Sequence, residues 1–203
     1  MSFASYKKIS TVLKKFQIFY HEENYVVVAP VTLSDYFQAE LNLVRTELVT
    51  NNSEYAIGEN LIYPLLKEIW KHHKEQLMLW SHEPLKYDED LSGVPDYVIT
   101  SKSPLGKLVF EQPYLIVVEA KQDNFIEGWG QCLAELVAVQ KLNDNHVEQT
   151  LFGIVSNGEI WEFGKLVGQQ FIKNTDSYLI KELDKLSGVL NYLFEQCQWQ
   201  FIR

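Results

Sequence analysis

Cysteine is scarce in this sequence and long apolar runs are absent, and each absence excludes a class of protein. The 203 residues include two cysteines, Cys132 and Cys197, and neither belongs to a CxxC motif or a Cys/His cluster. We therefore expect neither a zinc site nor a disulfide framework. No stretch reaches the apolar length that spans a bilayer, and the first residues lack the apolar run of a signal peptide. These features predict a cytoplasmic protein that does not bind membranes.

An excess of basic residues is also missing. The chain has 27 acidic residues against 18 lysines and arginines, so its formal net charge is −9. This balance counts against a nucleic-acid partner, because phosphate binding normally relies on a basic face. It does not exclude one, since carboxylates that hold a divalent cation add negative charge that the metal offsets. Two local basic stretches, residues 71–74 and Lys102 with Lys107, are interpreted as solvated surface charge.

No internal repeat, low-complexity tract or flexible linker divides the chain, so residues 1–203 are expected to form a single domain. Apolar spacing predicts helices over 4–16, Leu33–Leu48 (capped by Thr32 or Ser34), 54–73, 128–142 and 178–195. Pro64 predicts a kink in the third of these, or a start near Tyr63. Extended segments are expected at Tyr25–Val28, 77–87, 93–100, 115–118, 151–155 and 160–163, with a tight turn at 156–158.

The predicted order over residues 54–165 is helix, three strands, helix, strand, strand, with helical flanks at 1–53 and 166–203. Three consecutive strands on short connections favour an antiparallel meander. The helix that follows can cross over and place the next strand parallel to a neighbour. The expected fold class is therefore α/β (α+β), with a mixed central sheet flanked by helices.

The residues with the clearest chemical potential follow the apolar run 115–118. Glu119 and Lys121 form the only acid-x-Lys triplet in the chain, around Ala120. Residues two apart on a strand share a face, so both side chains should project together. A carboxylate and an ammonium group at the end of a buried strand are costly unless they are paired or used in chemistry. A salt bridge at the strand end would explain the triplet taken alone.

A second acid lies upstream, in Gly93-Val94-Pro95-Asp96-Tyr97, at the start of a strand expected to neighbour 115–121. Asp96 and Glu119 could then converge on one divalent cation, with the Ala120 carbonyl as a further ligand, because Mg²⁺ prefers oxygen ligands. Lys121 beside such a cation could orient the attacking water and offset charge on a phosphate. Alternatively, Asp96 only ends a turn, a common role for aspartate.

Together, Gly-x-Pro-Asp-Tyr, the apolar strand ending in Glu-Ala-Lys and the helix beginning Gly-Trp-Gly-Gln resemble the PD-(D/E)XK nuclease superfamily. Residues 151–163 are similar to the strand and hairpin after the catalytic helix in type I restriction-subunit nuclease domains. This restriction-endonuclease-like resemblance covers residues 54–165 and implies an αβββαβ core. It also implies that Asp96 and Glu119 bind Mg²⁺, with Mn²⁺ as a substitute, and that Lys121 is the catalytic lysine.

The resemblance assigns two further residues. Gln131 matches a helix glutamine that several branches place near the site, and Glu59 matches an early helical acid that some members add to the metal shell. Glu59 could instead be a solvated helix residue, and Gln131 could belong to a polar helix face with Glu135 one turn further on. The remaining candidates are expected to be structural: His72 and His73 at the surface, His21, His82 and His146 isolated, and Trp129 and Trp161 in the core.

Two functions from different classes follow. The first is Mg²⁺-dependent hydrolysis of phosphodiester bonds, with DNA as the expected substrate. The second is a non-catalytic protein that uses a nuclease scaffold for nucleic-acid or protein binding or assembly. The nuclease function predicts that the strand 115–121 is central in the sheet and neighbours the strand that contains Asp96. It also predicts that Asp96, Glu119 and Lys121 face one cleft. The apolar face of 33–48 and an alternating tail with Trp199 and Phe201 also need a partner, which favours a homodimer.

Overall fold

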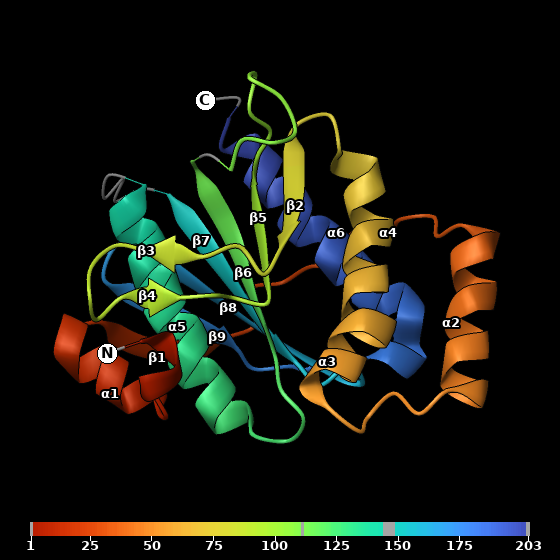
Figure 1. Cartoon of the computed structure of the whole chain (residues 1–203), viewed down its shortest axis with the longest axis horizontal. Coiled ribbons are helices and arrows are strands. Elements are labelled where there is room, and N and C mark those ends of the chain that lie inside the picture. The colour runs from red at the N-terminus through yellow and green to blue at the C-terminus, as the bar shows by residue number, and fades with distance from the viewer. Residues whose placement is uncertain (1, 111, 144–148, 202–203) are drawn as a thin grey trace.

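The computed structural model describes residues 2–110, 112–143 and 149–201, and it shows a mixed sheet with helices on both faces (Figure 1). The expected fold class is thus confirmed. Over residues 54–156 the order is helix, strands, helix, strand, as the sequence pattern predicts. His146 lies outside the described residues. Among the described helices, none combines the length and the apolar character needed to cross a membrane.

Eight strands form the main sheet within the described residues, and seven of them define its order. The order is β1 (Phe19–Glu23), β9 (Gln170–Asn174), β8 (Ile160–Val167), β7 (Thr150–Ser156), β6 (Tyr114–Ala120), β5 (Tyr97–Ser101) and β2 (Leu77–Ser81), with β10 (Tyr178–Leu179) paired to β8. The short strands β3 (Leu85–Lys86) and β4 (Ser92–Gly93) pair separately. Strand β6 runs antiparallel to β5 and parallel to β7. The predicted meander and crossover are therefore both present.

The helices form two layers, one on each face of the sheet (Figure 1). One layer contains α2 (Asp35–Glu47), α4 (Tyr63–His73) and α6 (Leu183–Trp199), and the other contains α1 (Ile9–Phe16) and α5 (Phe125–Leu142). All seven residues of β6 are buried. Ile116 and Val118 belong to the core of the first layer and Val117 to the core of the second, so β6 has a core on both sides.

Two local predictions on the helices are confirmed. The Ser34 hydroxyl, one of the two proposed caps, accepts a hydrogen bond from the Phe37 N–H at 3.2 Å. The helix of residues 54–73 is interrupted before Pro64: α3 (Glu54–Ile57) passes into a π-helical segment, η2 (Gly58–Ile62), and α4 starts at Tyr63. Proline fits the first turn of α4 because it has no N–H to donate there.

The flanks are not purely helical, which corrects the prediction for 1–53 and 166–203. They supply β1, β9 and β10 to the sheet. Tyr25–Val28 is irregular rather than a strand, because the N–H groups of Tyr25 and Val26 donate to the Asn174 side chain instead of a neighbouring strand. The first helix begins at Ile9, after a short 3-10 turn, η1 (Phe3–Ser5). The last begins after η3 (Ile180–Glu182) and continues to Trp199.

Burial changes the assignment of His73, which is not a surface residue. Its ring is 5% exposed, with Nδ1 2.8 Å from Gln198 Oε1 and Nε2 2.8 Å from Asn191 Oδ1, both on α6. His72 is exposed, as expected. Adjacent residues on a helix point in different directions, so one histidine of the pair faces α6 and the other faces solvent.

The apolar face of α2 finds its partner within the chain. Phe37, Leu41 and Val44 are buried in the same core cluster as α4 and α6. Half of the argument for a homodimer is therefore removed. Trp199 ends α6 rather than forming an alternating tail, and its side chain is 57% exposed. The homodimer stays a prediction that rests on this end of α6.

Candidate functional site

The candidate site is built at the end of β6, the strand expected to be central. Strand β6 lies between β5 and β7, and the pairing of Tyr97 with Val118 places Asp96, one residue earlier, opposite Glu119. The Asp96 carboxylate accepts a hydrogen bond at Oδ2 from the Ala120 N–H at 2.7 Å. This bond continues the pairing of the two strands where the backbone ladder ends. Asp96 is therefore held beside the Glu-Ala-Lys triplet.

Lys121 and Glu119 form a buried ion pair. The Lys121 Nζ atom lies 3.2 Å from Glu119 Oε2 and 3.7 Å from Glu54 Oε2. Lys121 is 7% exposed and Glu119 is 3% exposed. Burial acts to lower the pKa of Lys121, but the Glu119 and Glu54 carboxylates outweigh it and raise that pKa above its ordinary value. Lys121 therefore stays charged and immobilised.

A glycine makes room for this lysine. A Cβ atom at Gly128, in the first turn of α5, would lie 2.9 Å from Lys121 Cγ and 2.7 Å from Val155 Cγ1. Both distances are shorter than packed carbon atoms adopt. The alkyl chain of Lys121 thus occupies the space over Gly128, which directs its ammonium group toward Glu119 and Glu54.

Glu119 also faces a second buried acid, Glu135 of α5. Burial raises the pKa of Glu119 to about 7, and the negative charge of Asp96 adds to this rise. Burial and the charge of Glu119 raise the pKa of Glu135 well above its ordinary value. The two side chains form a hydrogen bond, which requires a proton on one of them. Without a cation, this pair therefore keeps a proton near neutral pH.

The surroundings of Asp96 include a histidine. His82 Nε2 lies 3.6 Å from Asp96 Oδ1, and its Nδ1 is 2.8 Å from the Ser81 hydroxyl. Burial raises the pKa of Asp96, against the opposing effects of the Ala120 N–H and the positive charge of Lys121. Asp96 is thus a partly exposed carboxylate next to a group that can carry a proton.

A cavity of about 280 Å³ opens beside Asp96. Its lining includes Glu54, Glu59, His82, Asp96 and Ala120. The structure therefore brings Glu59 to the same cavity as Asp96, although its side chain is exposed. This agrees with a place at the edge of the site and equally with the solvated helix residue considered above.

The expectation that one cleft exposes Asp96, Glu119 and Lys121 together is wrong in this form. Glu119 and Lys121 do not line the cavity, because they are turned toward α5 and covered by it. Gln131 is not joined to the other three: within the described ranges its Oε1 atom is buried with no hydrogen-bond partner. Asp96, Glu119 and Lys121 therefore form one connected charge network, of which Asp96 reaches the cavity together with the neighbouring Ala120.

The carboxylate and carbonyl oxygens of Asp96, Glu119 and Ala120 are the type of ligand that a hard divalent cation prefers. Among the described residues, no three His, Cys, Asp or Glu side chains form a group that could hold a metal ion. The donor set expected here contains only two such side chains, Asp96 and Glu119, with the Ala120 carbonyl. Mg²⁺ commonly takes one or two protein carboxylates and keeps several waters. No N–H or O–H group of the described residues donates to Glu135 Oε2, so this buried oxygen is left without a hydrogen bond.

Sequence reasoning missed three residues of this network: Glu54, His82 and Glu135. Glu135 was noticed only as a neighbour of Gln131, although a lone acid within the apolar stretch 133–139 signals a buried carboxylate. Glu54 and His82 leave no comparable signal, because the fold alone brings them to the end of β6. His82 is therefore not isolated, which corrects the expectation for it.

Comparisons with known proteins add no assignment. A scan against protein-family models gives no match, and a search of curated proteins finds no significant match. The case for a function accordingly rests on the site itself.

Proposed function

We propose that this chain is a Mg²⁺-dependent nuclease of the PD-(D/E)XK kind that hydrolyses phosphodiester bonds, with DNA as the expected substrate. The observation that carries the proposal is the buried Lys121–Glu119 ion pair at the end of the central strand, beside Asp96. Asp96, Glu119 and the Ala120 carbonyl would hold the cation. When bound, it would act as a Lewis acid toward the phosphate and lower the pKa of a bound water.

The charge of the site supports this proposal. Four carboxylates, those of Glu54, Asp96, Glu119 and Glu135, surround one lysine. Such a site repels a phosphodiester unless a cation compensates the excess negative charge. Lys121 would then offset the charge that develops on the phosphate, because its ammonium group is already fixed and needs no reorganisation.

Two substitutions test the assigned roles. Asp96→Asn keeps the shape and can still accept from the Ala120 N–H, but it removes a ligand charge, so it should weaken Mg²⁺ and Mn²⁺ binding in calorimetry. Lys121→Met keeps the alkyl chain over Gly128 and removes only the charge. It should leave cation binding intact or tighter and slow cleavage by on the order of 100-fold. Cleavage is measured on duplex DNA, single-stranded DNA and RNA.

Lys173→Met is the matched control for the lysine. Lys173 lies on β9, three strands from β6, and pairs with Glu162 at 2.9 Å. The Lys173→Met variant should cleave DNA at the same rate as the unmodified protein. Equal cleavage by Lys121→Met would reduce Lys121 to a salt-bridge partner. A chain that binds no divalent cation and cuts none of the substrates would replace the proposal with the non-catalytic scaffold.

A further inference from the structure

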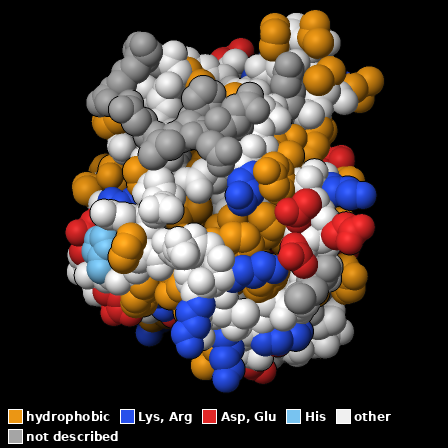
Figure 2. Space-filling view, turned by 90° about the vertical axis from the view of Figure 1, so that its left-hand side faces the viewer, with side chains coloured by type: hydrophobic (Ala, Val, Ile, Leu, Met, Phe, Trp, Pro, Cys, Tyr) orange, Lys and Arg blue, Asp and Glu red, His pale blue; other side chains and the backbone are white. Residues whose placement is uncertain are grey.

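The N-terminal segment is the most basic part of an otherwise acidic chain. Residues 1–21 contain four lysines, Lys7, Lys8, Lys14 and Lys15, and no acidic residue, whereas the whole chain has a net charge of −9. All four side chains are exposed. Figure 2 shows the side of the molecule that carries α1, and Lys and Arg side chains gather over its lower part. We call these four lysines the α1 patch.

The α1 patch is anchored next to the candidate site. A Cβ atom at Gly130 of α5 would collide with the backbone of Tyr6 and Lys8, so the segment crosses α5 in direct contact. Lys7 pairs with Glu127, also in the first turn of α5. Gly128, between these two positions, contacts Lys121. The first turns of α5 therefore contact the α1 patch on one side and the candidate site on the other.

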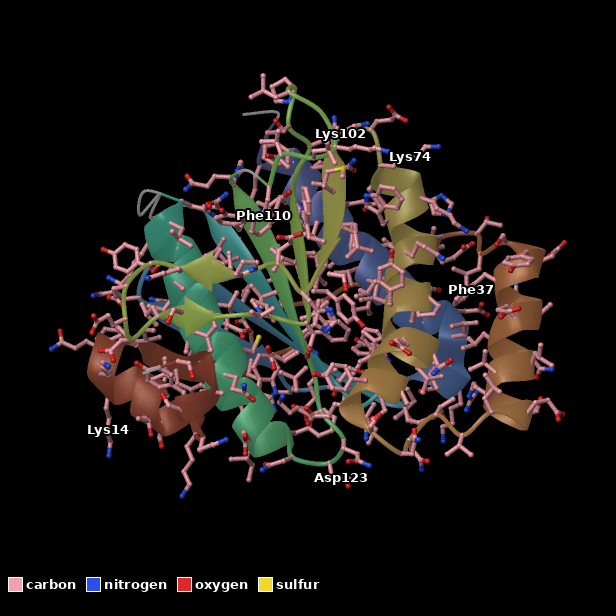
Figure 3. The ribbon with its side chains drawn as sticks, in the orientation of Figure 1. Lys14, Phe37, Lys74, Lys102, Phe110 and Asp123 are labelled. Atoms are coloured by element: carbon pink, nitrogen blue, oxygen red, sulfur yellow. The ribbon has the colours of Figure 1, made fainter. Side chains whose placement is uncertain are left out.

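Two lysines of the patch are unused by the fold. Lys7 pairs with Glu127, and Lys15 pairs with Asp90 at 2.7 Å. Lys8 and Lys14 have no ion-pair partner among the described residues. In Figure 3, Lys14 points outward at the lower edge of the molecule, the edge at which Asp123 lies in the loop that follows Lys121, while Lys102 lies at the opposite edge. The unused charge of Lys14 thus lies on the same edge as the loop that follows Lys121.

The packing of α1 decides which anionic partner the patch fits. A basic amphipathic helix can lie on an anionic membrane only if its apolar face is free to enter the lipid. Here Val12 is fully buried, and Ile9, Leu13 and Phe16 pack against the α5 side of the core. Only the lysine side of α1 is open. A phosphate backbone needs no more than that, because it is bound through charge alone.

We infer that the α1 patch is a binding surface for the phosphate backbone of nucleic acid, which it guides toward the end of β6. This inference rests on the proposed function, because it takes a phosphodiester polymer as the substrate. Lys8 and Lys14 make the contacts that the fold leaves open, whereas the charges of Lys7 and Lys15 are offset by Glu127 and Asp90. The surface carries no sequence preference, since it contacts phosphate rather than base edges.

The test is the affinity for a labelled 30-base-pair DNA duplex, measured by fluorescence anisotropy in EDTA so that no cleavage occurs. Lys8→Glu/Lys14→Glu should weaken binding at least ~10-fold and lower the slope of log K against log salt by about 2. The matched control is Lys102→Glu/Lys107→Glu, which makes the same charge change on exposed lysines of the 102–107 loop. It should change the affinity by less than about 2-fold, since its charges lie away from the phosphate.

The outcomes separate this inference from the proposed function. The inference would be overturned if both double variants weakened DNA binding equally, or if Lys8→Glu/Lys14→Glu had no effect on it. Binding of anionic vesicles in place of the duplex would also overturn it. Lys121→Met should bind the duplex like the unmodified protein. A chain that binds DNA through Lys8 and Lys14 but never cleaves it with Mg²⁺ would refute the nuclease and support the surface.

Discussion

The pair of buried glutamates makes a prediction about stability that needs no assumption on activity. Glu135→Gln replaces the acid of α5 that forms a hydrogen bond with Glu119. The amide has nearly the same shape and can donate to the Glu119 carboxylate without a titrating proton. The substitution should therefore remove the share of the pH dependence of stability that comes from Glu135 itself, whose pKa is raised well above its ordinary value by burial and by the charge of Glu119.

Glu119, which keeps its raised pKa in this variant, gives the scale of such a contribution, because burial raises that pKa from an ordinary 4.5 to about 7 in the folded protein. A raised pKa means that the folded state binds more protons than the unfolded state between these two values. The free energy of unfolding must then fall as the pH rises through this window, and level off above it. The expected loss from Glu119 alone is on the order of 3 kcal/mol.

The assay is urea unfolding in EDTA at pH values from 4.5 to 8. Glu135→Gln should match the unmodified protein at pH 4.5 and exceed it at pH 8 by ~1–3 kcal/mol. General repulsion in this acidic chain also grows with pH, so a control of equal charge change is needed. Glu47→Gln serves, because Glu47 is exposed on α2.

Parallel pH profiles for Glu135→Gln and the unmodified protein would refute the reasoning. The same holds if Glu47→Gln flattens the profile as much as Glu135→Gln does. In either case the Glu119–Glu135 pair would not hold the proton that burial assigns to it.

Two further substitutions probe the packing around the site and under α6. Gly128→Ala would gain ~1 kcal/mol in helix propensity in an open position, but its Cβ would meet Lys121 and Val155. It should therefore lower the melting temperature, and it should slow cleavage by displacing the lysine; a higher melting temperature would show that the space is free. His73→Ala should cost ~2–4 kcal/mol in urea unfolding, because it opens a cavity and leaves the buried amide oxygen of Asn191 without its partner. His72→Ala, at the exposed neighbour, should cost less than ~0.5 kcal/mol, and equal losses would contradict the burial of His73.

The core of the site could be predicted because its signal is local. The apolar run of β6 stops at Glu119, and the period of two places Lys121 on the same side. The position of β5 next to β6 also follows from the short connection between them. The sequence could not predict that α5 covers Glu119 and Lys121. This cover depends on the absence of a side chain at Gly128, which leaves room for Lys121, and on a crossover that brings Glu135 over the strand.

The edge of the sheet shows a second limit. Strand β1 has all five residues exposed, so its sequence carries no alternation of apolar and polar residues that would mark a strand. It joins the sheet through its backbone, paired in parallel with β9. Tyr25–Val28 has the composition of a strand but loses its pairing to the Asn174 side chain. Strand propensity depends on the neighbours that a segment meets. For that reason Phe19–Glu23 forms a strand and Tyr25–Val28 does not.

Stability alone does not account for the buried charges of the site. A buried ion pair such as Lys121–Glu119 adds little stability, because the cost of removing both groups from water offsets their attraction. Glu135 makes the balance worse, since it adds a second buried acid whose ionisation raises the cost further. A scaffold that only binds a partner gains nothing from this arrangement. A site that must attract a divalent cation and hold a fixed ammonium group beside it needs this excess of carboxylate, which is why the cation titration decides between the two proposed classes.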